Sequence, residues 1–82
     1  MMKGKWIWSS HIISRMNKRK LSKELIEKVI DEPDEIITEY MNRKIYQKII
    51  DNKLIRVVTE ENKLITVYIT SKIRKYMKGK LP

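Results

Sequence analysis

The sequence of 82 residues contains no cysteine, no phenylalanine and one histidine. Without cysteine there is no disulfide framework, no thiolate nucleophile and no cysteine-based zinc site. A single histidine also excludes a histidine-rich metal site, so we expect no metal and no other cofactor. Apolar runs are only a few residues long, whereas a membrane-spanning helix needs about 20 residues. The amino-terminal segment lacks a signal-peptide apolar stretch, so we expect a cytoplasmic protein without a membrane partner.

The charge that is present is strongly one-sided and is concentrated at the two ends of the chain. The net charge is +9; residues 1–23 carry +7 and residues 62–82 carry +6, both without any acid, and residues 24–61 carry −4. This balance favours an anionic partner, nucleic acid ahead of a membrane surface. Two solvated basic tails are the alternative. Because both blocks overlap segments with folded patterns, we expect a formed basic surface.

The first half of the folded region has a helical pattern. We expect one domain over residues 1–82, with an ordered core of about 6–76, because no linker or repeat interrupts the chain. Apolar residues at helical spacing predict helices over residues 10–19 and about 23–32, and Pro33 disfavours helical geometry just before it. The predicted N-caps are Ser9 or Ser10 for the first helix and Ser22 for the second.

The second half changes to the alternating pattern of strands. Short polar breaks between the segments force antiparallel neighbours, which makes the sheet a meander. The predicted fold class is therefore α+β, with two N-terminal helices packed on one face of a three- to four-stranded antiparallel meander sheet. The other face stays open. The predicted strands are Glu35–Tyr40, Lys44–Ile50, Leu54–Glu60 and Leu64–Thr70.

Three-residue hairpin loops are expected between the last three strands, since two-residue loops would set Lys48 beside Ile55 and a one-residue slip turns a strand over. In this register one face forms the core and the other is open. The predicted core face carries Ile45, Gln47, Ile49, Ile55, Val57, Thr59, Ile65, Val67 and Ile69. The predicted open face carries Tyr46, Lys48, Ile50, Leu54, Arg56, Val58, Leu64, Thr66, Tyr68 and Thr70.

The open face combines aromatic rings with cations. Rings such as Tyr46 and Tyr68 can stack on unpaired bases while Lys48 and Arg56 meet phosphates, which is the combination that a single-stranded RNA platform needs. A solvated strand face of ordinary composition is the alternative. The acids around Pro33 fit a solvated helix end better than a metal site.

His11 is the natural candidate for a general acid or base, because histidine exchanges protons readily near neutral pH. Arg15 lies one helical turn away and could stabilise an anion beside it. The alternative is a histidine that only caps a helix or donates a hydrogen bond.

The order of elements and several short motifs resemble a small family grouped with the RelE/ParE and BrnT toxins of toxin–antitoxin pairs. The resemblance extends from Ser10 to Tyr76. The matching segments are His11-Ile-Ile-Ser-Arg15-Met16-Asn-Lys-Arg19, Asp31-Glu32-Pro33-Asp34-Glu35, Tyr46-Gln-Lys48, Leu54-Ile-Arg56-Val57-Val58 and Thr66-Val67-Tyr68-Ile-Thr70-Ser71-Lys72.

This resemblance implies a RelE-like fold and metal-independent cleavage of messenger RNA on the ribosome. It implies Arg56 and Lys48 as the cations that offset charge on the reacting phosphate, and His11, Tyr68 or Tyr76 as proton carriers. The predicted RNA-binding residues are Tyr46, Arg15, Arg19, Lys72, Arg74 and Tyr76.

The leading hypothesis is therefore that the protein is the toxin of a type II toxin–antitoxin pair. It would be an endoribonuclease that a cognate antitoxin protein inhibits. A non-catalytic RNA-binding module is the first alternative. A toxin that acts by binding a protein, in the ParE manner, is the second.

Overall fold

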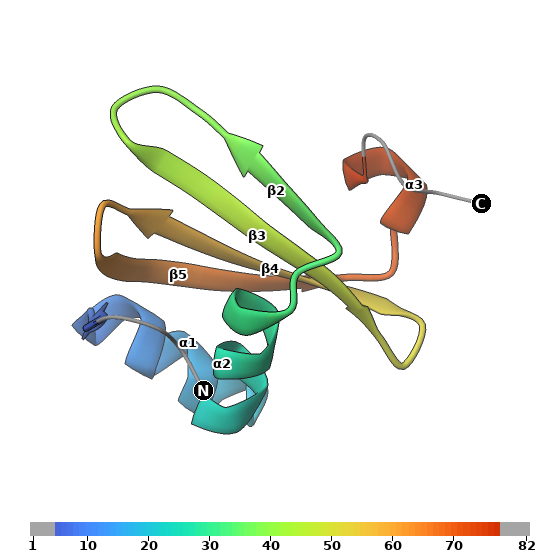
Figure 1. Ribbon diagram of the computed structural model, residues 1–82. Coiled ribbons are helices and arrows are strands. Elements are labelled where there is room, and N and C mark those ends of the chain that lie inside the picture. Colours follow the sequence, from blue (N-terminus) through green and yellow to red (C-terminus); the bar gives the residue numbers. More distant parts are fainter. Residues whose placement is uncertain (1–4, 78–82) are drawn as a thin grey trace.

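The computed structural model describes residues 5–77, and Lys3, Lys78 and Lys80 of the basic ends lie outside the described residues. The described chain is an α+β fold with two helices before the main sheet and a short one after it (Figure 1). Its elements are β1 (Ile7–Trp8), α1 (Ser10–Arg19), α2 (Lys23–Asp31), β2 (Glu35–Thr38), β3 (Arg43–Ile50), β4 (Lys53–Glu60), β5 (Lys63–Thr70) and α3 (Ile73–Tyr76).

The two long helices begin where the serines predict. Ser9 Oγ accepts a hydrogen bond from the backbone N–H of Ile12 at 3.1 Å, and Ser22 Oγ accepts one from that of Leu25 at 3.1 Å. These caps satisfy N–H groups that have no partner inside the helix. The first helix covers the predicted residues, and the second ends at Asp31, one residue earlier than predicted.

The sheet has five strands in the order β1-β5-β4-β3-β2. The antiparallel meander from β2 to β5 is present as predicted. The predicted count of three to four strands is wrong, because Ile7 and Trp8 add a short strand parallel to β5 and make the sheet mixed. A strand of two residues is too short to show an alternating pattern in the sequence. The pairing of β1 with β5 therefore depends on where the rest of the chain places the edge of β5.

The helices α1 and α2 lie on one side of the sheet, and we call that side the helix face (Figure 1). Their apolar stripes pack against inward side chains of the central strands, and burying each such side chain contributes about 1.5–3 kcal/mol. The core consists of Ile12, Met16, Ile26, Val29, Ile30, Ile55, Val57, Leu64 and Val67.

The turn between β3 and β4 decides which side chains of β3 face the helices. Asp51 and Asn52 form a two-residue turn with φ values of 52° and 65°, and Lys48 is paired with Ile55. The predicted three-residue loop is therefore wrong, because Asp and Asn tolerate the left-handed backbone that a two-residue hairpin needs. As a result Tyr46 and Lys48 lie on the helix face, and the predicted faces of β3 are exchanged.

The turn between β4 and β5 also has two residues, since Glu60 is paired with Lys63. A β-bulge between Val58 and Thr59 then shifts the register by one residue. The bulge restores the predicted alternation further along β5, so Val67 packs against the helices as expected. Leu64 lies before the bulge and is buried in the core, which corrects its predicted place on the open face.

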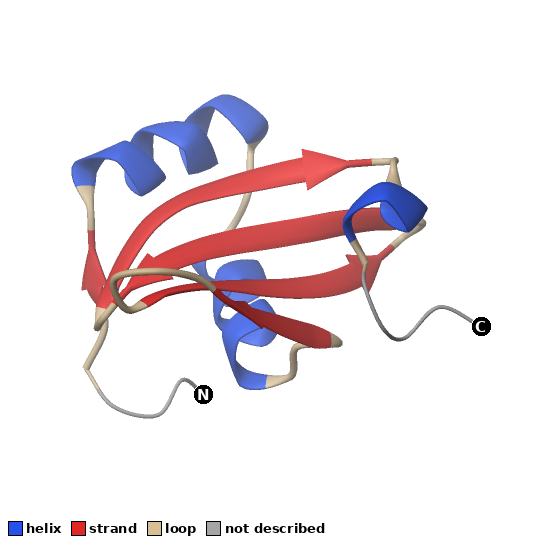
Figure 2. Cartoon of the chain, turned by 90° about the horizontal axis from the view of Figure 1, so that it is seen from above, coloured by secondary structure: helices blue, strands red, loops and turns tan. Residues whose placement is uncertain are grey.

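The opposite side of the sheet is not fully open, because α3 turns back onto it after β5 (Figure 2). We call this side the α3 face. It carries Ile45, Gln47 and Ile49 from β3, Leu54, Arg56 and Val58 from β4, and Thr66, Tyr68 and Thr70 from β5.

Candidate functional site

Arg56 lies near the middle of the α3 face, between Gln47 on β3 and Tyr68 on β5 in the strand register. Its Nε donates a hydrogen bond to Gln47 Oε1 at 2.6 Å. Its guanidinium carbon lies 4.2 Å from the centre of the Tyr76 ring. One edge and one face of the guanidinium are thus held by the protein. Within residues 5–77 its Nη groups have no hydrogen-bond partner, which leaves them for a ligand.

Tyr76 is brought to Arg56 by the short helix α3. The carbonyl oxygen of Tyr76 accepts a hydrogen bond from Gln47 Nε2 at 3.1 Å, and the next residue, Met77, is buried. Lys75 Nζ lies 5.5 Å from the same ring centre. The ring therefore contacts two cations, an arrangement that cation–π attraction stabilises.

An open pocket of about 390 Å³ lies beside this stacked pair. Arg56, Tyr68, Thr70 and Tyr76 supply the side chains at its wall, together with Ile69. Thr70 Oγ1 accepts a hydrogen bond from the backbone N–H of Lys72 at 3.0 Å, which shapes the chain between β5 and α3. The pocket thus combines a guanidinium fork with two phenols, groups that can bind a phosphate and move protons.

Arg15 reaches the same face from α1. Its Nε donates to the carbonyl oxygen of Val67 at 3.3 Å, and its guanidinium carbon lies 5.1 Å from the ring centre of Tyr68. Ser9 Oγ donates to the carbonyl oxygen of Ile65 on the same strand at 2.9 Å. Together these contacts cover part of the outer edge of β5 beyond its short pairing with β1, and edges of this kind otherwise invite association.

The structure therefore brings Arg15, Arg56, Tyr68 and Tyr76 of the predicted site together. His11 and Arg19 are exposed one turn before and one turn after Arg15 on α1, and they flank the group along that helix. Lys72 and Arg74 are exposed, Lys72 just before α3 and Arg74 within it. Each basic end thus places one cation on a ring of this site: Arg15 lies over Tyr68 and Lys75 over Tyr76.

Lys48 and Tyr46 do not belong to this group, which corrects their prediction as open-face residues. Lys48 Nζ donates to the carbonyl oxygen of Glu32 at 2.8 Å and lies 3.9 Å from Asp34 Oδ1, at the end of α2. Tyr46 packs edge-to-face with Trp6, with ring centres 6.1 Å apart. Both residues are on the helix face because the two-residue turn exchanges the faces of β3.

Gln47 lies on the face opposite to the one that the sequence pattern predicts. The pattern places it in the core beneath the helices, yet its fully buried amide lies on the α3 face and contacts Arg56 and α3. The signal in the sequence is the uncharged polar side chain inside an apolar strand, because a buried amide needs partners for its hydrogen-bonding groups.

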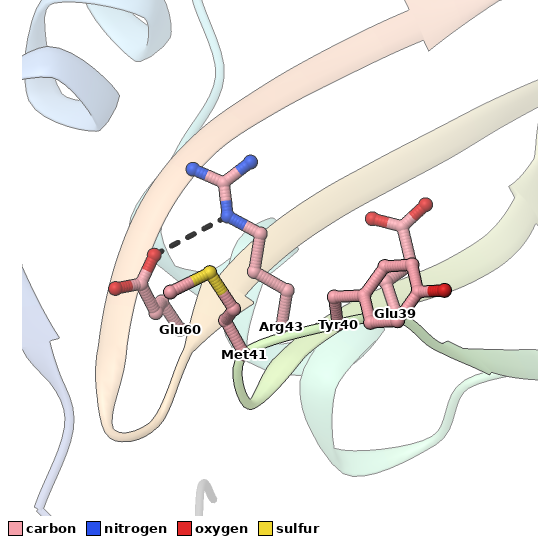
Figure 3. A pocket seen from close by; sticks show the side chains of 5 residues that line it. All are labelled: Glu39, Tyr40, Met41, Arg43 and Glu60. Atoms are coloured by element: carbon pink, nitrogen blue, oxygen red, sulfur yellow. Dashed lines mark hydrogen bonds and ion pairs between the residues drawn. The ribbon is translucent and has the colours of Figure 1, made fainter.

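A second pocket, of about 400 Å³, lies at the turn between β2 and β3 (Figure 3). It is lined by Glu39, Tyr40, Met41, Arg43 and Glu60. Arg43 Nε lies 3.2 Å from Glu60 Oε1, and Figure 3 shows these two side chains directed at each other. Because its one cation is already paired, this pocket offers less to an anionic ligand than the Arg56 pocket does.

Two features are absent from residues 5–77. No helix in this range is both long and apolar enough to cross a membrane. No group of three or more His, Cys, Asp or Glu side chains that could hold a metal ion occurs in it.

Comparison with known proteins gives a family but no characterised relative. No curated protein and no solved structure matches the chain significantly. Residues 8–69, from the second residue of β1 to the next-to-last residue of β5, match the family described as Domain of unknown function (DUF4258). Because this match covers most of the chain, the protein belongs to the DUF4258 family.

Proposed function

We propose that this protein binds single-stranded RNA across the α3 face and cleaves it without a metal, as the toxin of a type II toxin–antitoxin pair in the cytoplasm. The observation that carries the proposal is the Arg56 guanidinium, which is held on one edge and one face and keeps its Nη groups for a ligand. A planar fork of this kind matches the oxygens of a phosphate.

The surroundings of Arg56 support an RNA phosphate as that ligand. Lys75 lies over the Tyr76 ring, and Arg15 approaches the Tyr68 ring from α1. Lys72 and Arg74 are exposed just before and within α3, the helix that carries Tyr76. Several cations around one open pocket attract a polyanion over a distance and make its binding depend on salt. The free face of Tyr68, whose residue is 44% exposed, can contact a base or a ribose.

Cleavage would follow the chemistry of RNA itself. The 2′-oxygen attacks the adjacent 3′-phosphorus, a new P–O bond forms, and the bond to the 5′-oxygen of the next nucleotide breaks. The products are a 2′,3′-cyclic phosphate and a 5′-hydroxyl. Arg56 would offset charge on the phosphorane, and the Tyr68 phenol would donate the proton to the leaving oxygen. His11 on α1, or Tyr76 in the pocket in its phenolate form, would accept the proton of the 2′-hydroxyl.

A specific observation favours the second candidate, a non-catalytic RNA-binding protein. The described wall of the pocket contains phenols and a guanidinium, but His11 and every carboxylate lie outside it. Phenols are poor proton acceptors at neutral pH, so the pocket is better equipped to bind a phosphate than to deprotonate a hydroxyl. In this case RNA binds with the same residues and is released intact.

The deciding experiment compares the wild type with Arg56→Ala, and uses Lys28→Ala on the exposed surface of α2 as a control that loses the same charge. Expression of the wild type and of Lys28→Ala should arrest growth, and Arg56→Ala should relieve the arrest. The purified wild type should release RNA fragments that end in a cyclic phosphate.

Intact RNA together with salt-dependent binding would support the second candidate. Growth arrest by the wild type and Arg56→Ala alike, with no RNA bound or cut, would overturn both and favour a toxin that binds a protein. The cognate antitoxin should cover the α3 face, so the complex should bind less RNA than the free protein does.

A further inference from the structure

Gln47 joins four elements through one buried side chain. Its residue is 0% exposed, and its Nε2 donates to Glu35 Oε1 on β2 at 2.9 Å and to the carbonyl oxygen of Tyr76 at 3.1 Å. Its Oε1 accepts from Arg56 Nε on β4 at 2.6 Å. Both N–H groups and one lone pair of the amide oxygen are thus used, so neither polar atom of this buried side chain lacks a partner.

The chemistry of these partners explains why an amide fits this position. Arg56 needs an acceptor, whereas the Glu35 carboxylate and the Tyr76 carbonyl need donors. A carboxylate at position 47 would accept the hydrogen bond from Arg56 but would repel the carboxylate of Glu35. An apolar side chain at position 47 would make none of the three hydrogen bonds. The amide is also uncharged, so it orients the guanidinium without neutralising it.

We propose that Gln47 is the positioning residue of the RNA site: it holds Arg56 so that the Nη edge of the guanidinium faces a bound phosphate. This inference rests on the proposed RNA-binding function. It adds that the Arg56 guanidinium is already oriented for a phosphate before RNA binds. A guanidinium fixed before binding loses less side-chain freedom when the ligand arrives, so the affinity is higher than for a mobile arginine. Gln47 itself does not touch the RNA.

The test is a double-mutant cycle on RNA affinity with Gln47→Leu, Arg56→Lys and the double variant. The ligand is a short fluorescent oligouridine, and fluorescence anisotropy gives the dissociation constant. Arg56→Lys keeps the charge but lacks the fork, so we expect affinity to fall about tenfold, and Gln47→Leu should cost about as much. The double variant should be little weaker than Arg56→Lys alone, because residues that act through each other are not additive.

A readout of position separates this role from a merely structural one. The Nε–H of Arg56 should exchange slowly with water in the wild type, as measured by nitrogen-15 NMR, and quickly in Gln47→Leu. Gln47→Glu has nearly the same size and still offers an acceptor to Arg56. It should therefore retain slow exchange of the Nε–H and yet bind RNA more weakly, because a buried negative charge now faces the guanidinium. Slow exchange in Gln47→Leu would overturn the proposal, even if that variant were less stable.

The outcomes distinguish this inference from the function on which it rests. Wild-type protein that binds no RNA, or Arg56→Lys that binds it unchanged, would overturn the proposed function. Arg56→Lys that weakens binding while Gln47→Leu does not, or losses that multiply in the double variant, would leave that function standing and overturn only the positioning role of Gln47.

Discussion

The guanidinium of Arg56 stacks on the ring of Tyr76, with 4.2 Å between its central carbon and the ring centre. One face of this ring is thus occupied by a cation that the protein itself supplies, and Lys75 lies 5.5 Å from the same centre. The ring of Tyr68 likewise lies against a guanidinium, that of Arg15. Tyr68 and Tyr76, two tyrosines of the predicted site, therefore each hold an arginine, which points to recognition of phosphate more than of bases.

Binding should accordingly depend on phosphates more than on bases. Replacing one phosphate of a bound oligonucleotide by an uncharged methylphosphonate should weaken binding at the sensitive position, whereas removing a base should have a smaller effect. Arg56→Ala should lower the slope of log affinity against log salt by about one, and Lys28→Ala should leave it unchanged. Anisotropy titrations at several salt concentrations measure both. A large effect of removing a base combined with an unchanged slope would contradict recognition by phosphate.

Tyr68→Phe should separate cleavage from binding. Phenylalanine keeps a ring for Arg15 but has no hydroxyl, so RNA affinity should stay near that of the wild type while the cleavage rate falls by roughly 10²–10⁴-fold if the phenol is the proton donor. Tyr68→Ala removes the ring as well and should reduce both quantities. Single-turnover cleavage and anisotropy on the same RNA provide the comparison. Unchanged cleavage in Tyr68→Phe would remove this residue from the mechanism.

Lys48→Ala should affect stability and not RNA. Lys48 Nζ donates to the carbonyl oxygen of Glu32 just after α2, and losing this partly exposed bond should lower the free energy of unfolding by about 1 kcal/mol. Urea denaturation followed by circular dichroism measures that change. RNA affinity should equal that of the wild type, since Lys48 lies on the helix face. If Lys48→Ala had normal stability but a lower affinity for RNA, Lys48 would belong to the RNA site after all.

The two-residue turn can be tested at Asn52, whose φ is 65°. Asn52→Val should lower the free energy of unfolding by about 1–2 kcal/mol, because a β-branched side chain opposes the left-handed backbone. Asn52→Gly should be neutral or stabilising, since glycine adopts this conformation without a steric cost. Equal stability of both variants in urea would argue against the two-residue turn, and with it against the exchanged faces of β3.

Ser9 and Ser22 provide a matched pair of helix caps. Each side chain caps one helix, but Ser9 Oγ also donates to the carbonyl oxygen of Ile65 on β5. Ser22→Ala should lower the free energy of unfolding by about 1 kcal/mol, and Ser9→Ala by about 2 kcal/mol, because it also loses that contact. A larger loss for Ser22→Ala would mean that the bond from Ser9 to β5 adds nothing.

Local patterns were sufficient wherever the determining interactions are close in sequence. Helix α1 has its predicted residues because Ser9 caps it and an apolar stripe follows at helical spacing. The antiparallel meander follows in the same way, since its connections are too short for any other arrangement. Arg56, Tyr68 and Thr70 lie on the face predicted for them because alternation along β4 and β5 is preserved beyond the bulge.

The site required distant parts of the chain to meet. Arg56 and Tyr76 lie on separate elements, and only the return of α3 onto the sheet stacks one on the other. The side of the sheet that Gln47 and Lys48 face depends on a single residue in the length of one turn, and the alternating pattern of β3 fits either face because apolar side chains occur on both.

The sequence by itself therefore determined the class of fold, the two capped helices and the concentration of positive charge at the ends. These depend on short-range backbone preferences and on composition. The tertiary structure alone decided that Gln47, and not Lys48, is the neighbour of Arg56. The physical reason is that strand register is set by turn geometry and by packing against the helices, and a shift of one residue moves a side chain to the opposite side of the sheet.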